Sequence, residues 1–169
     1  MLASAMNMRP QMFKAIHLNA PFLDIRGCLM DSDLPLSKSD YHEFGDPTTD
    51  PRAYDSISSL CPYTNLQSAE YPSVLITAFK DDYRTPLWNV LKYTSKFRDT
   101  VKKPQKVKEF CDKNICMIVD EGSHLGTNDS KSNVERNAIS TAYFEWIVET
   151  MSTDVTSKTK STLFRNLFG

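Results

Sequence analysis

SVLITA, residues 73–78, is the strongest β-strand signal in the chain. The run is apolar and rich in β-branched residues, and Tyr71-Pro72 precedes it. Two further apolar runs follow the same pattern, AIHLN at residues 15–19 and NICMIV at residues 114–119. Their apolar residues are largely continuous rather than alternating, as in strands that are covered on both faces. We therefore expect three buried strands.

Helical patterns separate these runs. Residues 1–8 are short, apolar and rich in Ala and Met, and they predict a helix that ends before Pro10. A second helix is predicted from apolar spacing at Leu87, Val90, Leu91, Thr94 and Phe97. A final helix is predicted from one apolar face, formed by Val134, Ala138, Ile139, Ala142, Tyr143, Trp146 and Ile147. This order predicts an α/β fold with a mainly parallel sheet that helices cover on both faces.

Residues 31–62 carry four prolines and a glycine that interrupt regular structure. We expect irregular chain there, with one or two short helices. One of these is predicted from Pro51 to Leu60, with Asp50 as its N-cap.

Composition excludes several classes of function. The net charge is -1, from 20 Lys+Arg against 21 Asp+Glu, which argues against nucleic acid or an anionic membrane as the main partner. No apolar run approaches the ~20 residues of a transmembrane helix. The 5 glycines form no phosphate-binding loop or dinucleotide fingerprint, so we expect no organic cofactor. The 4 cysteines lack zinc-site spacing, so we expect no metal, and free thiols favour a cytoplasmic location.

Two polar loops follow neighbouring strands. The acidic turn from Lys80 to Arg84 follows the strand at 73–78, and a loop with His124 follows the strand at 114–119. Ligands bind at the carboxyl ends of parallel strands, so the two loops are expected to meet there. An Asp and then a His, in this order, are two members of an α/β-hydrolase triad. A lone loop histidine is more often structural, so position alone leaves both readings open.

Six sequence blocks carry a resemblance to a known family. They are MRPQMFKA (8–15), APFLD (20–24), LPL (34–36), EFGDP (43–47), CPYTN (61–65) and YPS (71–73). In this order, and with the Asp and His loops, they resemble the prolyl oligopeptidase family of serine peptidases. The likeness is nearest to its oligopeptidase B and prolyl endopeptidase-like branches. It covers residues 1–151, which we expect to be the C-terminal part of an α/β-hydrolase catalytic domain, followed by a polar tail over residues 152–169.

The resemblance implies roles for particular residues. His124, in the Gly-rich loop, would be the general base. The family's Asp-x-Arg turn matches Asp82-Tyr83-Arg84, so Asp82 would orient His124, with Asp81 as the runner-up. Arg84 would help to anchor the substrate. Acidic residues that receive basic side chains in oligopeptidase B relatives map to Asp40 and Glu43. His42 stands where an acid is common, which argues against strict trypsin-like specificity.

The family's nucleophile is not found in this sequence. The resemblance places the Gly-x-Ser-x-Gly-Gly elbow just upstream of Met1, and Ser4 has no flanking glycines and cannot form it. We therefore expect the chain alone to be inactive and to associate with the missing N-terminal part of the catalytic domain. Two functions stay open. One is a serine endopeptidase or oligopeptidase that cleaves peptides through an acyl-enzyme, and the other is a non-catalytic regulatory or binding module derived from the prolyl endopeptidase-like branch.

Overall fold

The centre of the fold is a parallel three-stranded sheet. The computed structural model describes residues 1–101, 115–127 and 129–152. The strands are β1 (Ala15–Asn19), β2 (Ser73–Phe79) and β3 (Ile115–Asp120), in the order β1-β2-β3. In register, Ile16 lies beside Val74, and Ile76 beside Met117. All three predicted strands are present, and the predicted parallel sheet is confirmed.

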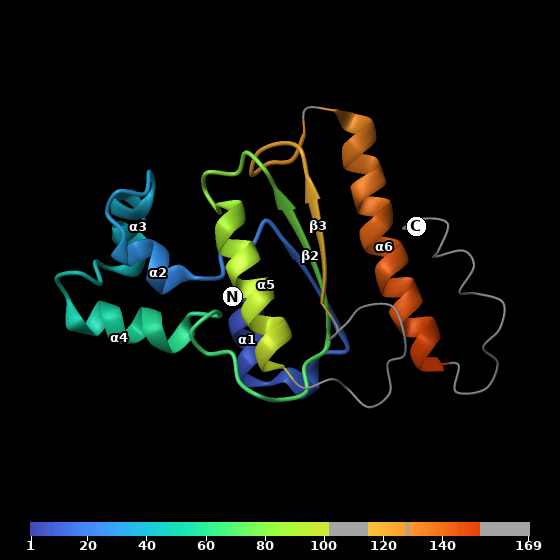
Figure 1. Cartoon of the computed structure of the whole chain (residues 1–169), viewed down its shortest axis with the longest axis horizontal. Coiled ribbons are helices and arrows are strands. Elements are labelled where there is room, and N and C mark those ends of the chain that lie inside the picture. Colours follow the sequence, from blue (N-terminus) through green and yellow to red (C-terminus); the bar gives the residue numbers. More distant parts are fainter. Residues whose placement is uncertain (102–114, 128, 153–169) are drawn as a thin grey trace.

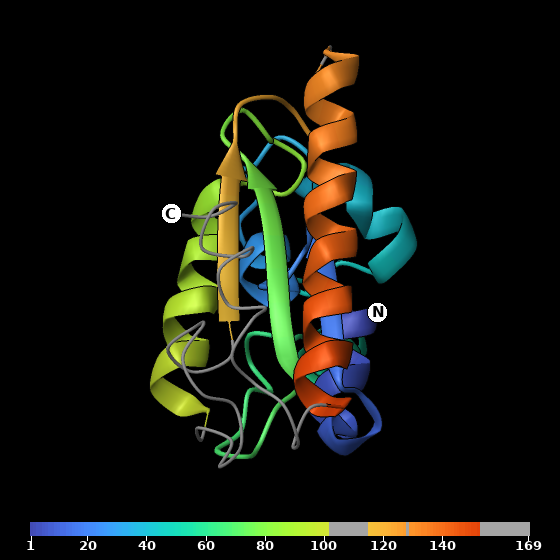
Figure 2. The same cartoon turned by 90° about the vertical axis from the view of Figure 1, so that its right-hand side faces the viewer.

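Helices cover both faces of this sheet. Helix α5 (Leu87–Thr100) lies on one face, and helix α6 (Ser130–Ser152) lies on the other (Figures 1 and 2). Successive residues of β2 therefore point alternately into two cores. Val74 and Ile76 pack in the α5 core with Phe97, whereas Leu75 packs with Tyr143 of α6. Every residue of β2 is buried, which explains why its sequence is apolar except at Ser73 and Thr77 and does not alternate.

The remaining helices precede β2. They are α1 (Leu2–Met8), the short helix η1 (Pro10–Met12), α2 (Ile25–Met30), α3 (Ser37–Phe44) and α4 (Pro51–Leu60). Helices α2, α3 and α4 form a small lobe beside the sheet, with a core of Leu29, Ala53 and Ile57 (Figure 1). The predicted helix at 51–60 is confirmed, and the Asp50 side chain accepts a hydrogen bond from Arg52 N as its N-cap.

Some exposed positions differ from the prediction. Val134 and Ala138 were expected on the buried face of the last helix, yet both are exposed. The start of α6 extends past the ends of the strands (Figure 2). From Arg136 onward, the side of the helix that faces the sheet runs through Arg136, Tyr143 and Ile147, and Ala138 lies outside it. Leu91 of α5 is also exposed, because the buried stripe of that helix runs through Val90, Tyr93 and Phe97 instead.

The predicted polar tail lies outside the described residues, apart from Ser152, which ends α6. Within the described ranges, no helix is both long and apolar enough to cross a membrane.

Candidate active site

Asp82 and His124 meet at the carboxyl end of the sheet. Asp82 lies in the turn after β2, and His124 lies in the loop after β3. The Nδ1 atom of His124 is 3.0 Å from the Oδ2 atom of Asp82. The Asp82 side chain is 1% exposed and the His124 side chain is 36% exposed, so a buried carboxylate supports a ring that solvent can reach.

The Asp82 carboxylate is held by its own turn. Its Oδ1 accepts from the backbone N–H groups of Arg84 (3.0 Å) and Thr85 (2.8 Å), and its Oδ2 accepts from the Thr85 hydroxyl (2.7 Å). Burial acts to raise the pKa of Asp82, but the hydrogen bonds from Thr85 and His124 outweigh it and hold the pKa below its usual value. Asp82 is therefore an anion at neutral pH.

These contacts also fix the tautomer of His124. The Thr85 hydroxyl has one hydrogen, and its shortest contact directs that hydrogen to Asp82 Oδ2. The carboxylate has no proton to give, so Nδ1 of His124 must carry the hydrogen that lies between ring and carboxylate. In the neutral ring, Nε2 then bears the lone pair, and among the described residues it has no hydrogen-bond partner. The pair can accept a proton at Nε2 and stabilise the imidazolium that results.

A tight turn presents His124. Ser123 and Gly126 exchange two backbone hydrogen bonds, of 3.0 and 2.8 Å, and His124 lies between them. Gly122 has a φ of +120°, and a Cβ on it would lie 2.6 Å from the Gly126 carbonyl oxygen, so only glycine fits. The amide of Asp81 donates to the Gly122 carbonyl (3.0 Å), which joins the His124 loop to the turn that carries Asp82.

The runner-up residue, Asp81, is exposed and outside this pair. Of the other predicted site residues, Arg84 lies in the Asp82 turn, and Asp40 and Glu43 lie on α3. The guanidinium of Arg84 is 3.7 Å from the carboxylate of Asp40 on α3, and Glu43 is exposed on the same helix. Ser4 lies on α1 and donates to the Leu60 carbonyl (2.7 Å) at the end of α4.

Two residues of the site region were not identified from the sequence. Thr85 donates to the Asp82 carboxylate from both its amide and its hydroxyl, and its position three residues after an Asp is a turn signal that could have indicated it. Asn89 is completely buried in α5, and its Oδ1 accepts from the amides of Leu23 (3.1 Å) and Asp24 (3.0 Å) after β1. No feature of the sequence marks Asn89, because its partners lie more than 60 residues away.

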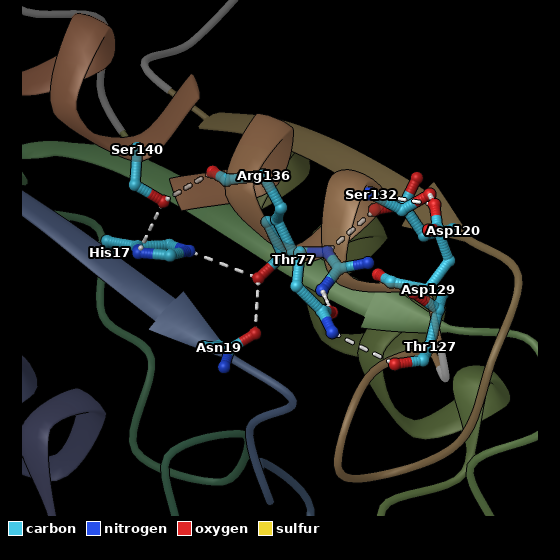
Figure 3. Close-up of polar contacts among 10 residues, drawn as sticks. His17, Asn19, Thr77, Asp120, Thr127, Asp129, Ser132, Arg136 and Ser140 are labelled. Carbon is cyan, nitrogen blue, oxygen red and sulfur yellow. Dashed lines mark hydrogen bonds and ion pairs between the residues drawn. The ribbon is translucent and has the colours of Figure 1, made fainter. Parts of the chain in front are cut away.

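His17 of β1 has a hydrogen-bond partner at each of its ring nitrogens. Its Nε2 lies 3.1 Å from Thr77 Oγ1, and its Nδ1 lies 3.2 Å from Ser140 Oγ of α6 (Figure 3). Thr77 gives its own hydrogen to Asn19 Oδ1 (2.7 Å), so the ring donates from Nε2 and accepts at Nδ1. Burial lowers the pKa of His17, which favours this neutral form. Within the described ranges, no cluster of His, Cys, Asp or Glu could hold a metal ion.

Comparison of the sequence with known proteins identifies the family of this chain. The model of the prolyl oligopeptidase family matches residues 1–150. A prolyl endopeptidase-like protein from Macaca fascicularis is 33% identical over 159 residues, which cover 92% of this chain and 21% of that protein. One from Gallus gallus is 35% identical over 137 residues (78% of this chain, 19% of that protein). Dipeptidyl aminopeptidase BI from Pseudoxanthomonas mexicana is 31% identical over 99 residues (59% and 14%).

Solved structures agree with these matches. Oligopeptidase B from Leishmania major has a TM-score of 0.79 and 25% identity, over 88% of this chain and 20% of that one. Oligopeptidase B from Trypanosoma brucei has a TM-score of 0.66 and 25% identity, over 74% and 16%. The predicted α/β-hydrolase fold is thereby confirmed. The chain spans about one fifth of the length of the first of these relatives.

Proposed function

The chain belongs to the prolyl oligopeptidase family, and we propose that it supplies the acid–base pair of a serine peptidase. His124 is the general base and Asp82 is the carboxylate that orients it. The observation that carries this proposal is the 3.0 Å contact between His124 Nδ1 and the buried Asp82 carboxylate, at the carboxyl ends of adjacent parallel strands. The substrate class is a peptide, and the reaction is hydrolysis of its peptide bond through an acyl-enzyme.

The proposed steps follow from the tautomer of His124. Nε2 takes the proton of a serine hydroxyl as its oxygen attacks the peptide carbonyl. The imidazolium then gives that proton to the leaving amine, and the acyl-enzyme forms as the C–N bond breaks. Water attacks the acyl group by the same two proton transfers, which releases the acid and restores the serine. Asp82 stays ionised throughout and stabilises the imidazolium.

The serine comes, in this proposal, from a Gly-x-Ser-x-Gly segment that is not among these residues. The open edge of β1 is where the rest of the catalytic domain would dock, since among the described strands β1 pairs with β2 alone. An apolar groove of about 650 Å³ adjoins this edge. It is lined by Met12, Phe13, Lys14 and Ala15 on one side and by Phe144, Ile147 and Val148 of α6 on the other. The occupant we propose is a further parallel strand of the same sheet with the residues that flank it.

Substrate contacts are proposed for the surface between the turn and α3. Arg84 is half-exposed, and its guanidinium can donate a hydrogen bond to a substrate carbonyl. Its ion pair with Asp40 neutralises part of the charge of that acid, so Glu43 is the acid more free to receive a basic side chain. This favours a moderate rather than strict preference for basic residues. The buried free thiols of Cys28 and Cys61 are consistent with a reducing, cytoplasmic setting.

A non-catalytic binding module is the second candidate. The specific observation in its favour is that the chain by itself holds no Gly-x-Ser-x-Gly sequence. Both candidates predict that the chain alone gives no hydrolase turnover and no stoichiometric labelling of a serine by a fluorophosphonate probe. They differ in what happens when the nucleophile segment is present.

The deciding experiment uses a protein in which the chain is continuous with its Gly-x-Ser-x-Gly segment. Asp82→Asn is expected to lower kcat by about 10⁴-fold, because it stabilises the wrong tautomer of His124. Asp81→Asn is the matched control and should stay within a few-fold of the parent. If Asp81→Asn is the inactive variant, the orienting carboxylate is misassigned. If Asp82→Asn and His124→Ala are both silent, the peptidase proposal fails and the binding module replaces it.

A further inference from the structure

Arg136 of α6 is an almost fully buried cation near the site. It is 9% exposed, and its guanidinium lies 4.7 Å from the centre of the Phe79 ring at the end of β2. Its Nε donates to Asp120 Oδ2 (2.8 Å; Figure 3). Its Nη1 donates to Asn133 Oδ1 (2.9 Å). Removing a guanidinium from water is costly, so a helix that only needed to cover the sheet would use apolar contacts there. Tyr143 and Ile147 already provide such contacts further along α6.

Arg136 is connected to both ends of the His124 loop. Asp120 is the last residue of β3, immediately before the loop. Asn133 donates from Nδ2 to the carbonyl of Thr127, where the loop ends (2.9 Å). Because Arg136 binds Asn133 Oδ1, it also directs the Nδ2 group toward Thr127. One guanidinium thus links both ends of the loop to α6, directly at Asp120 and through Asn133 at Thr127.

The base of the tight turn rests on the same cluster. A Cβ on Gly126 would lie 2.9 Å from Asn133 Oδ1 and 3.2 Å from Arg136 Nη1. Gly126 also exchanges backbone hydrogen bonds with Ser123, the residue immediately before His124. Gly126 thus packs closely against Asn133 and Arg136, so a displacement of these side chains is expected to disturb the turn that carries the ring.

We propose that Arg136 is a positioning residue that holds the His124 loop where Nδ1 meets Asp82. Its importance for turnover rests on the function proposed above, but its effect on the His124–Asp82 contact does not. The contact can be observed without catalysis, because the Nδ1 hydrogen of a histidine bonded to a buried carboxylate exchanges slowly with water and gives a distinct low-field proton signal.

The test is NMR of the ¹⁵N-labelled chain and of matched variants. Arg136→Met is expected to abolish the Nδ1–H signal of His124 or to speed its exchange at least about tenfold. Arg136→Lys should give an intermediate result, because a single ammonium cannot reproduce the planar fork that binds Asp120 and Asn133 together. The control is Lys92→Met, which removes a cation of α5 from the buried Asp24 carboxylate on the other face of the sheet. The signal should persist in that variant.

Kinetics of the protein that includes the nucleophile segment provide the second readout. Arg136→Met should lower kcat by about 100-fold with little change in KM, because the ring is displaced by about 1 Å. A signal that survives in Arg136→Met, that is absent from the parent chain, or that is lost equally in Lys92→Met overturns the positioning role. If instead the signal depends on Arg136 while Asp82→Asn leaves turnover unchanged, the proposed function fails and the positioning role stands.

Discussion

Replacing Asp82 with Asn tests the site through its stability as well as its chemistry. The carboxylate accepts four hydrogen bonds, from the amides of Arg84 and Thr85, the Thr85 hydroxyl and His124 Nδ1. An Asn side chain can keep its carbonyl oxygen toward the two amides. Its NH₂ group then faces the Thr85 hydroxyl and Nδ1 of His124, and it can donate to them only if the hydroxyl turns its hydrogen away and the ring takes the Nε2–H tautomer.

The cost can be worked out from these contacts. Two hydrogen bonds to a charged acceptor are lost, each with a net contribution of about 1.5–3 kcal/mol. The Thr85 hydroxyl can donate instead to the Ala20 carbonyl oxygen, 3.2 Å away, which offsets part of this loss. We expect Asp82→Asn to lower the free energy of unfolding by about 2–4 kcal/mol. Asp81→Asn changes an exposed side chain and should stay within about 0.5 kcal/mol.

Urea unfolding of the chain at equal protein concentrations, followed by circular dichroism, measures both values. The pKa of Asp82 is lower in the folded state than in the unfolded state, so its contribution is present above the ordinary carboxyl pKa of ~3.9. The contribution is lost as the pH falls through the lower, folded-state pKa. The gap between parent and Asp82→Asn should therefore be full at pH 7 and shrink below about pH 4. A larger loss for Asp81→Asn, or a gap that stays constant as the solution is acidified, would refute the reasoning.

Three further outcomes are expected of the same chain. Asn89→Ala leaves two buried amides without an acceptor and should cost about 3 kcal/mol in urea unfolding, against less than about 0.5 for the exposed Asn137→Ala. Phe97→Ala, at a fully buried ring, should cost about 3–5 kcal/mol, whereas Leu91→Ala on the exposed side of α5 should cost less than about 1; equal losses would contradict the packing described. Burial raises the pKa of the Cys28 thiol to about 12, so iodoacetamide at pH 8 should label it only after unfolding, as mass spectrometry of the digest would show.

The strands could be predicted because the sequence around each of them carries the signal. β2 is covered on both faces, so every position from Val74 to Phe79 is buried, and the resulting run is apolar without alternation. α5 and the helix at 51–60 were found from their spacing and capping residues. Helix α2 was not predicted. It has six residues and includes Gly27, and its N-cap, Asp24, is held by Lys92 from another part of the chain.

The candidate site divides in the same way. Asp82 and His124 could be singled out because each follows a strand, and the carboxyl ends of parallel strands lie together. Their approach to 3.0 Å depends on contacts between residues distant in sequence, which no local pattern contains. Arg136 belongs to the last helix, which was predicted only from its apolar face. Its proposed positioning role depends on Asp120 and Asn133 converging on one guanidinium, and the spacing of these residues does not indicate this.

In the proposed peptidase, both members of the acid–base pair, Asp82 and His124, lie within this chain. Every hydrogen bond that Asp82 accepts comes from its own turn or from His124, and the His124 loop is fixed to β3 and α6. None of these contacts requires the segment that would bring a serine. On this proposal, the tautomer of His124 is set before a nucleophile arrives, and the pair is preorganised rather than assembled on docking. In the proposed peptidase, joining the two parts of the sheet would then need to position only one hydroxyl against Nε2, which is an easier requirement than aligning three groups at once.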